Sequence, residues 1–162
     1  MTVITHNRRR SRLSTLIDQP GGVSAGVALA QAKANLAEYE ARSREVIEEQ
    51  VAALAALQPP ATLADTPRVL DQAYSRSSAV IDAAGPFDLG DLCAAAANLC
   101  DLIDAAPDDR PFDWRIVTVH AQALRLLLTL PAEAAEARVQ VLASLKDVLK
   151  AKAPGAIAQP GG

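Results

Sequence analysis

This chain contains little of the chemistry on which enzymes and metal proteins depend. Its 162 residues include only two histidines, two cysteines, one tryptophan and 3% aromatic residues. Neither histidine has a catalytic partner near it in the sequence. The sequence also contains no glycine-rich phosphate loop, no zinc-ligand spacing and no serine in a nucleophile elbow. We therefore expect a protein that is not an enzyme and that holds no metal and no cofactor.

Long apolar runs are missing as well. No stretch reaches the ~18 apolar residues that indicate a membrane-spanning helix, and the N-terminus lacks the apolar region of a secretory signal. Cys93 and Cys100 lie seven positions apart in a helical pattern, which separates them by roughly 10 Å. A disulfide needs Cα atoms within about 7 Å, so we expect both thiols to be free, small core residues. These features favour a cytoplasmic protein without a membrane span.

Charge is moderate and unevenly distributed. Charged residues make up 22% of the chain and the net charge is −3. Residues 1–22 nevertheless carry a cluster of arginines opposed only by Asp18. The cluster consists of Arg8, Arg9, Arg10 and Arg12. One hypothesis is a solvated tail, and the other is a flexible basic arm that binds an acidic protein partner. Nucleic acid is not expected, because no basic face or stacking aromatics occur elsewhere.

The chain is rich in aliphatic residues that favour helices. Half of its residues are hydrophobic, and apolar positions recur with a period of 3.6 residues. The pattern predicts helices over residues 23–57, 67–84, 89–106, 114–130 and 131–152. Thr66 and Asp88 are expected as N-caps, and Pro131 as the start of the last helix. We therefore predict an all-α helical bundle of four to five helices, with a single helical domain at 23–153 and flexible termini at 1–22 and 154–162.

The first predicted helix is longer than the others. Leu29, Leu36 and Tyr39 fall on one stripe, but the heptad pattern is not sustained, which favours packing on a bundle over a long coiled coil. A helix of this length is also a candidate surface for a homodimer. The side chains that two copies could share are Leu36, Tyr39, Val46 and Ile47.

His120 is the one histidine inside the predicted helical body, and two interpretations of it remain open. It lies opposite the polar stripe that contains Arg115, Gln122 and Arg125, which favours a buried histidine bonded to a neighbour. The alternative is a phosphoacceptor in a histidine phosphotransfer module. That family usually places a basic and then a small residue after the histidine, and Ala123 and Leu124 stand there instead.

Two segments carry a family resemblance. Residues 20–22 are Pro-Gly-Gly and lead into an alanine-rich helix. The second segment runs from Phe87 to Cys100, Trp114 and the stretch 119–125. Together they resemble a small accessory protein of alphaproteobacterial chemotaxis clusters, the CheE type. The resemblance implies a non-enzymatic cytoplasmic adaptor or modulator of chemotaxis signalling that acts by protein–protein binding, and it transfers no site residue. A structural dimeric helical protein remains a further alternative.

Overall fold

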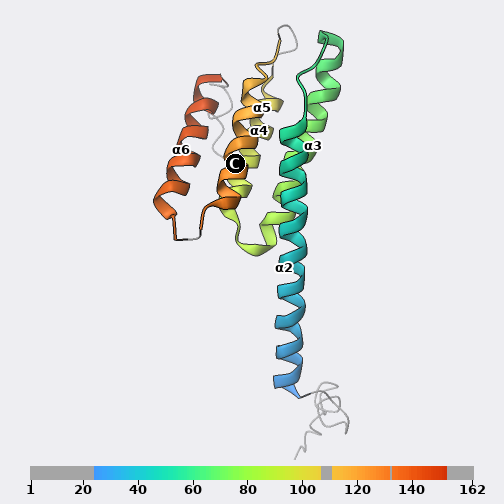
Figure 1. Cartoon of the computed structure of the whole chain (residues 1–162), viewed down its shortest axis with the longest axis vertical. Coiled ribbons are helices and arrows are strands. Elements are labelled where there is room, and N and C mark those ends of the chain that lie inside the picture. The colour runs from blue at the N-terminus through green and yellow to red at the C-terminus, as the bar shows by residue number, and fades with distance from the viewer. Residues whose placement is uncertain (1–23, 107–110, 132, 153–162) are drawn as a thin grey trace, which may run out of the picture. The chain divides into compact units, whose positions relative to one another are not determined.

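The computed structural model describes residues 24–106, 111–131 and 133–152 (Figure 1). Over these residues it contains α-helices and short 3-10 helices, and no strand. The elements are α2 (Ala25–Ala56), η1 (Leu63–Asp65), α3 (Thr66–Ala84), η2 (Gly85–Phe87), α4 (Gly90–Asp104), α5 (Arg115–Thr129) and α6 (Ala135–Lys152). The predicted all-α class is confirmed. The predicted flexible arm and tail lie outside the described residues.

The chain divides into two compact units within α2, the first ending at Glu38 and the second starting at Tyr39. The described part of the first unit, residues 24–38, consists of the start of α2 and the residue before it, and every side chain in it is exposed. The second unit contains the rest of α2 and all the other helices. The core therefore belongs to the second unit alone.

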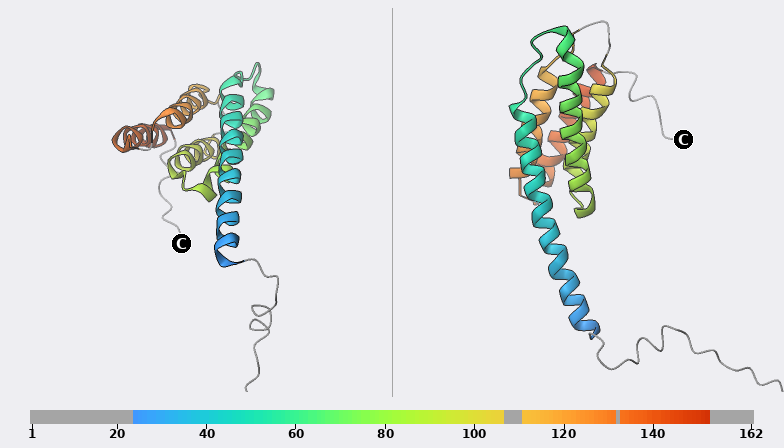
Figure 2. Two further views of the ribbon diagram at one scale, coloured as in Figure 1. Left: turned by 60° about the horizontal axis from the view of Figure 1, so that its bottom comes forward. Right: turned by 90° about the vertical axis from the view of Figure 1, so that its right-hand side faces the viewer.

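The core of the second unit is aliphatic and centres on α4, which packs against α3, α5 and α6 (Figures 1 and 2). Ala95 and Ala96 are fully buried on α4, and their small side chains let neighbouring helices approach closely. The large buried side chains come from every helix around them. They include Ile47, Val51, Leu54, Val80, Leu92, Leu99, Val117, Leu124, Leu127 and Leu145.

Within this unit α2 lies beside α3 (Figure 2). Arg76 Nη1 on α3 donates to Gln50 Oε1 on α2 over 2.9 Å, and the Ser43 hydroxyl on α2 donates to the Ala83 carbonyl oxygen. Ile47, which the sequence suggested as a residue shared between two chains, is 0% exposed inside this core. That part of the prediction is wrong, because Ile47 packs within its own chain.

Both of the predicted N-caps are also wrong. Thr66 is the first residue of α3 and not its cap, because η1 precedes it and Thr62 caps that turn by accepting the Asp65 N–H at 3.3 Å. Asp88 has a left-handed backbone, with φ 57°, at the end of η2. The residue before α4 is Leu89, which makes no side-chain cap. In both places a 3-10 turn inserted between helices shifts the helix start.

The last helix starts at Ala135, not at Pro131 as expected. Arg138, near the start of α6, is directed back towards the end of α5. Its Nη2 donates to the carbonyl oxygens of Leu130 at 2.6 Å and of Leu127 at 3.1 Å, and its Nε donates to that of Pro131 at 3.3 Å. The carbonyls that end α5 are thus satisfied by a side chain of α6.

Candidate functional site

His120 on α5 is the residue with the most distinctive chemistry, and its side chain is 0% exposed. Its ring lies between α5 and α4. The Nδ1 atom is 2.7 Å from the Ile116 carbonyl oxygen, one turn earlier. The Nε2 atom is 2.7 Å from Oδ1 of the Asn98 side chain on α4. Both ring nitrogens are therefore occupied by neighbours, as the sequence predicted for a buried histidine.

The hydrogen bonds of His120 determine which protonation state of its ring suits this site. A carbonyl oxygen only accepts, so Nδ1 carries the proton that it donates to Ile116. A neutral ring carries one N–H, so Nε2 must accept. The Asn98 amide satisfies it only when its NH2 group takes the place of Oδ1 beside Nε2. Burial lowers the pKa of His120, an effect opposed in part by the hydrogen bond to the Ile116 carbonyl. The neutral ring is accordingly the form that the core stabilises.

This geometry opposes phosphoryl transfer at His120. A phosphoacceptor needs one ring nitrogen open to solvent, and cations to stabilise the added charge. Arg115, Gln122 and Arg125 lie on the exposed face of α5, away from the ring. The buried polar side chains in the described part of the chain are Ser77, Asn98 and His120, none of which is a permanent cation.

The two thiols are free, as expected. Cys100 is buried, and burial together with the nearby carboxylates of Asp104 and Asp101 raises its pKa to about 11. Cys93 is half-buried, and burial also raises its pKa. A raised pKa keeps a thiol protonated and unreactive at neutral pH. Neither cysteine therefore has the properties of a nucleophile.

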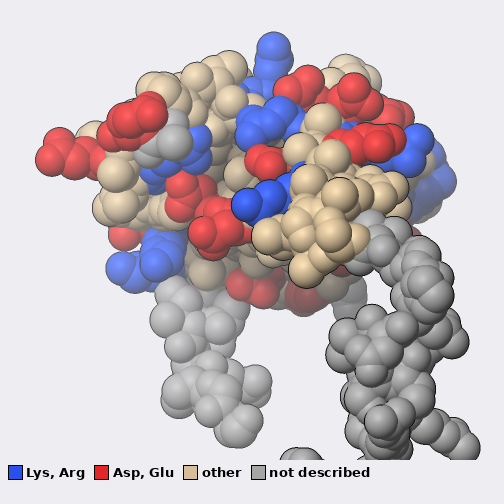
Figure 3. Space-filling model, turned by 90° about the horizontal axis from the view of Figure 1, so that it is seen from below, with Lys and Arg blue, Asp and Glu red and all other residues tan. Residues whose placement is uncertain are grey.

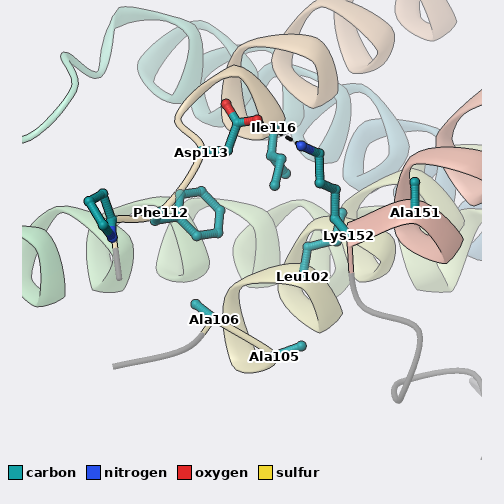
Figure 4. A pocket seen from close by; sticks show the side chains of 9 residues that line it. Leu102, Ala105, Ala106, Phe112, Asp113, Ile116, Ala151 and Lys152 are labelled. Carbon is teal, nitrogen blue, oxygen red and sulfur yellow. Dashed lines mark hydrogen bonds and ion pairs between the residues drawn. The ribbon is translucent and has the colours of Figure 1, made fainter. Parts of the chain in front are cut away.

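A cleft of about 290 Å³ lies where the end of α4, the start of α5 and the end of α6 meet (Figure 4). Leu102, Phe112 and Ile116 contribute apolar walls. At its edge Lys152 Nζ and Asp113 Oδ2 point towards one another at a distance of 3.0 Å. Sequence patterns did not indicate this pair, because the two residues belong to opposite ends of separate segments.

The carboxylate in this cleft is held as an anion. Asp113 accepts hydrogen bonds from Arg115 Nε and Nη2, each at 2.9 Å, and from the Arg115 backbone N–H at 3.2 Å. Its pKa is lowered chiefly by the Arg115 side chain, then by Lys152. A carboxylate paired in this way is a poor proton acceptor or nucleophile. The pair links the segment before α5 to the end of α6, and the cleft carries no catalytic constellation.

The proposed partner-binding residues Arg8, Arg9, Arg10 and Arg12 lie outside the described residues. The described surface that stands out is α2, where every residue from Ala25 to Arg42 is exposed. This stretch includes aliphatic and aromatic side chains that a helix of a globular protein normally buries. Leu29 is 58% exposed, Leu36 59% and Tyr39 62%. The spacing in the sequence identified this stripe, but the expectation that it packs on a bundle is wrong, because these side chains are exposed.

Acidic and basic side chains are interspersed over the face seen in Figure 3. Among the described residues there is no group of three or more histidine, cysteine or acidic side chains that could hold a metal. None of the helices described is long and apolar enough to cross a membrane.

Comparison with known proteins yields no further assignment. No protein-family model, no curated protein and no solved structure matches this chain.

Proposed function

We propose that this protein is a non-enzymatic helical adaptor or modulator that acts by protein–protein binding, in the cytoplasm and in bacterial chemotaxis signalling. The observation that carries the proposal is the exposed start of α2. Leu29 and Leu36 of the first unit are 58% and 59% exposed, and Tyr39 at the start of the second unit is 62% exposed. Burial of such side chains against a partner removes apolar surface from water, which is the main driving force for association.

The chemistry at the other candidate positions supports an adaptor over an enzyme or a phosphorelay module. His120 is sequestered by Asn98 and Ile116, Asp113 is neutralised by cations, and the thiols have raised pKa values. The link to chemotaxis depends on the resemblance to CheE-type accessory proteins. The partner is then a signalling component encoded with such a cluster.

The test uses the tagged full chain in an alphaproteobacterium that carries a chemotaxis cluster. We expect the wild type to capture a chemotaxis signalling protein, and the Leu36→Glu variant to lose that capture because a charge on the stripe opposes its burial. Ala34→Glu is the matched control, because Ala34 is also exposed on α2 but lies on the opposite face. Capture that survives Leu36→Glu, or that Ala34→Glu abolishes equally, would contradict the proposal.

A dimeric structural protein is the second candidate, and the same stripe favours it. Leu36 and Tyr39 are exposed, and Val46 is 37% exposed, so these three remain available to a second copy although Ile47 does not. Sedimentation equilibrium of the wild type and of Leu36→Glu distinguishes the candidates. A dimer that Leu36→Glu converts to monomer supports this second role, and a monomer at all concentrations removes it.

A further inference from the structure

A groove separates the end of α2 from α5 within the second unit. It has a volume of about 120 Å³, which is smaller than the ~300 Å³ at which small-molecule pockets begin. Its floor is apolar and comes from Leu54, Val117 and Ala121, while Trp114 and Leu57 form half-buried walls. A groove of this size accepts one or two side chains of a protein partner rather than a whole metabolite.

The rim of the groove is polar and positively charged. Thr118, Gln122 and Arg125 line it and are exposed. Arg125 forms no ion pair with any described carboxylate. Arg115, the other charged residue of α5, is neutralised by Asp113 at 2.9 Å. The groove therefore combines an apolar floor with one unmatched guanidinium.

α5 differs from the other described helices in its charge. It contains arginines but no aspartate or glutamate, whereas each of the other described α-helices contains acidic residues. Its outer face also exposes two aliphatic side chains beside the rim, Val119 at 41% and Leu126 at 46%. A chain of net charge −3 thus presents one helix surface that is apolar and positive.

We propose that this groove, lined by Leu54, Trp114, Val117 and Arg125, docks an acidic amphipathic helix of a partner protein. An aliphatic side chain of that helix would fill the floor, and a neighbouring carboxylate would pair with Arg125. Charge complementarity selects this occupant, since a basic segment is repelled by Arg125. The chain's own arginine cluster at residues 8–12 carries the same sign as the rim. This inference rests on the proposed adaptor function and names its partner's chemistry.

Trp114 provides the readout, because it is the chain's one tryptophan and lines the groove. The probe is a synthetic amphipathic helical peptide with leucines on one face and glutamates beside them. A second peptide has lysine in place of each glutamate. We expect the glutamate peptide to change Trp114 emission in the full-length protein and to shift the methyl NMR signals of Leu54, Leu57 and Val117. The lysine peptide should bind at least about tenfold more weakly.

Two variants test the rim. Arg125→Glu should weaken binding of the glutamate peptide about tenfold. The nearly isosteric Gln122→Glu should also weaken this binding, because it adds a negative charge at the rim. Gln140→Glu on α6 is the matched control, because Gln140 is exposed and does not line the groove. Equal binding of both peptides, methyl shifts confined to other faces, or unchanged affinity in Arg125→Glu would each overturn the proposal. If the methyl signals of the groove shift when the protein alone is concentrated, a second copy of the chain occupies the groove. This result would also overturn the proposal.

Capture of the cellular partner by the full chain tests the adaptor function separately from the groove. If the full chain still captures its cellular partner through the α2 stripe while no peptide binds at Trp114, the groove inference fails and the adaptor proposal stands. If capture is absent altogether, the adaptor proposal fails whatever the peptide does.

Discussion

Arg138 of α6 and Asp91 of α4 are joined by an ion pair in which Nη1 lies 3.1 Å from Oδ2. The same guanidinium donates to carbonyl oxygens at the end of α5, at Leu127 and Leu130. The Arg138 side chain is 19% exposed. One residue therefore links three helices, and its position opposite the negative end of α5 is the arrangement that the helix dipole favours.

Arg138→Met should destabilise the fold by about 2–3 kcal/mol, because it leaves partly buried carbonyls without donors. Asp91→Asn removes the partly exposed ion pair and the acidic charge in the first turn of α4, and should cost only about 1 kcal/mol. Urea unfolding of both variants measures the difference. Equal losses of unfolding free energy in the two variants would show that the ion pair, and not the capping of α5 by Arg138, accounts for the destabilisation.

Leu124→Ala should destabilise the protein by about 2–5 kcal/mol, since Leu124 is fully buried and its truncation leaves a cavity. Leu99→Ala on α4 should behave in the same way for the same reason. Val139→Ala is the control, because Val139 is exposed on α6 and its truncation should change stability by less than about 0.5 kcal/mol. If Leu124→Ala destabilises the protein as little as Val139→Ala does, Leu124 lies outside the core.

Stability should fall as the pH drops below about 6.5, the ordinary pKa of histidine. Burial lowers the pKa of His120 in the folded state. The unfolded chain therefore takes up the proton first, and the free energy of unfolding decreases with a slope of at most about 1.4 kcal/mol per pH unit. Above this pH the neutral ring contributes its full stability.

Urea unfolding between pH 5 and pH 8 tests this dependence, since the paired carboxylate of Asp113 has its pKa lowered from 3.8 and titrates below the window. In His120→Gln, whose amide can replace the ring's hydrogen bonds, the slope between pH 5 and pH 7 should flatten. An identical slope in the wild type and the variant would show that His120 is not the group responsible.

His120 should not accept phosphate. Nδ1 lies 2.7 Å from the Ile116 carbonyl oxygen, and Nε2 lies 2.7 Å from Asn98 Oδ1. Burial of an unpaired phosphoryl charge would cost several kcal/mol. Incubation with a phosphorylated response regulator or an autophosphorylated kinase should leave the protein unlabelled, with an active histidine phosphotransfer protein labelled in parallel. An acid-labile phosphoryl signal that disappears in His120→Gln would instead support the phosphorelay alternative.

The sequence by itself determined which segments are helices and, for α4 and α5, which faces they bury. The 3.6-residue period of apolar positions identified five helices, placed Leu99 and Leu124 in the core and directed His120 inwards. It also identified the stripe of Leu29 and Leu36. These features are local, because the direction of a side chain on a helix follows from its spacing along the same helix.

Only the tertiary structure decided which residues meet across helices. The pairing of His120 with Asn98, that of Lys152 with Asp113, and the return of Arg138 to the end of α5 depend on how each helix is rotated and shifted against its neighbours. The groove beside Trp114 arises in the same way, from the end of one helix and the face of another. Packing sets these positions, because interdigitation of aliphatic side chains selects one register among several that the periodicity alone allows.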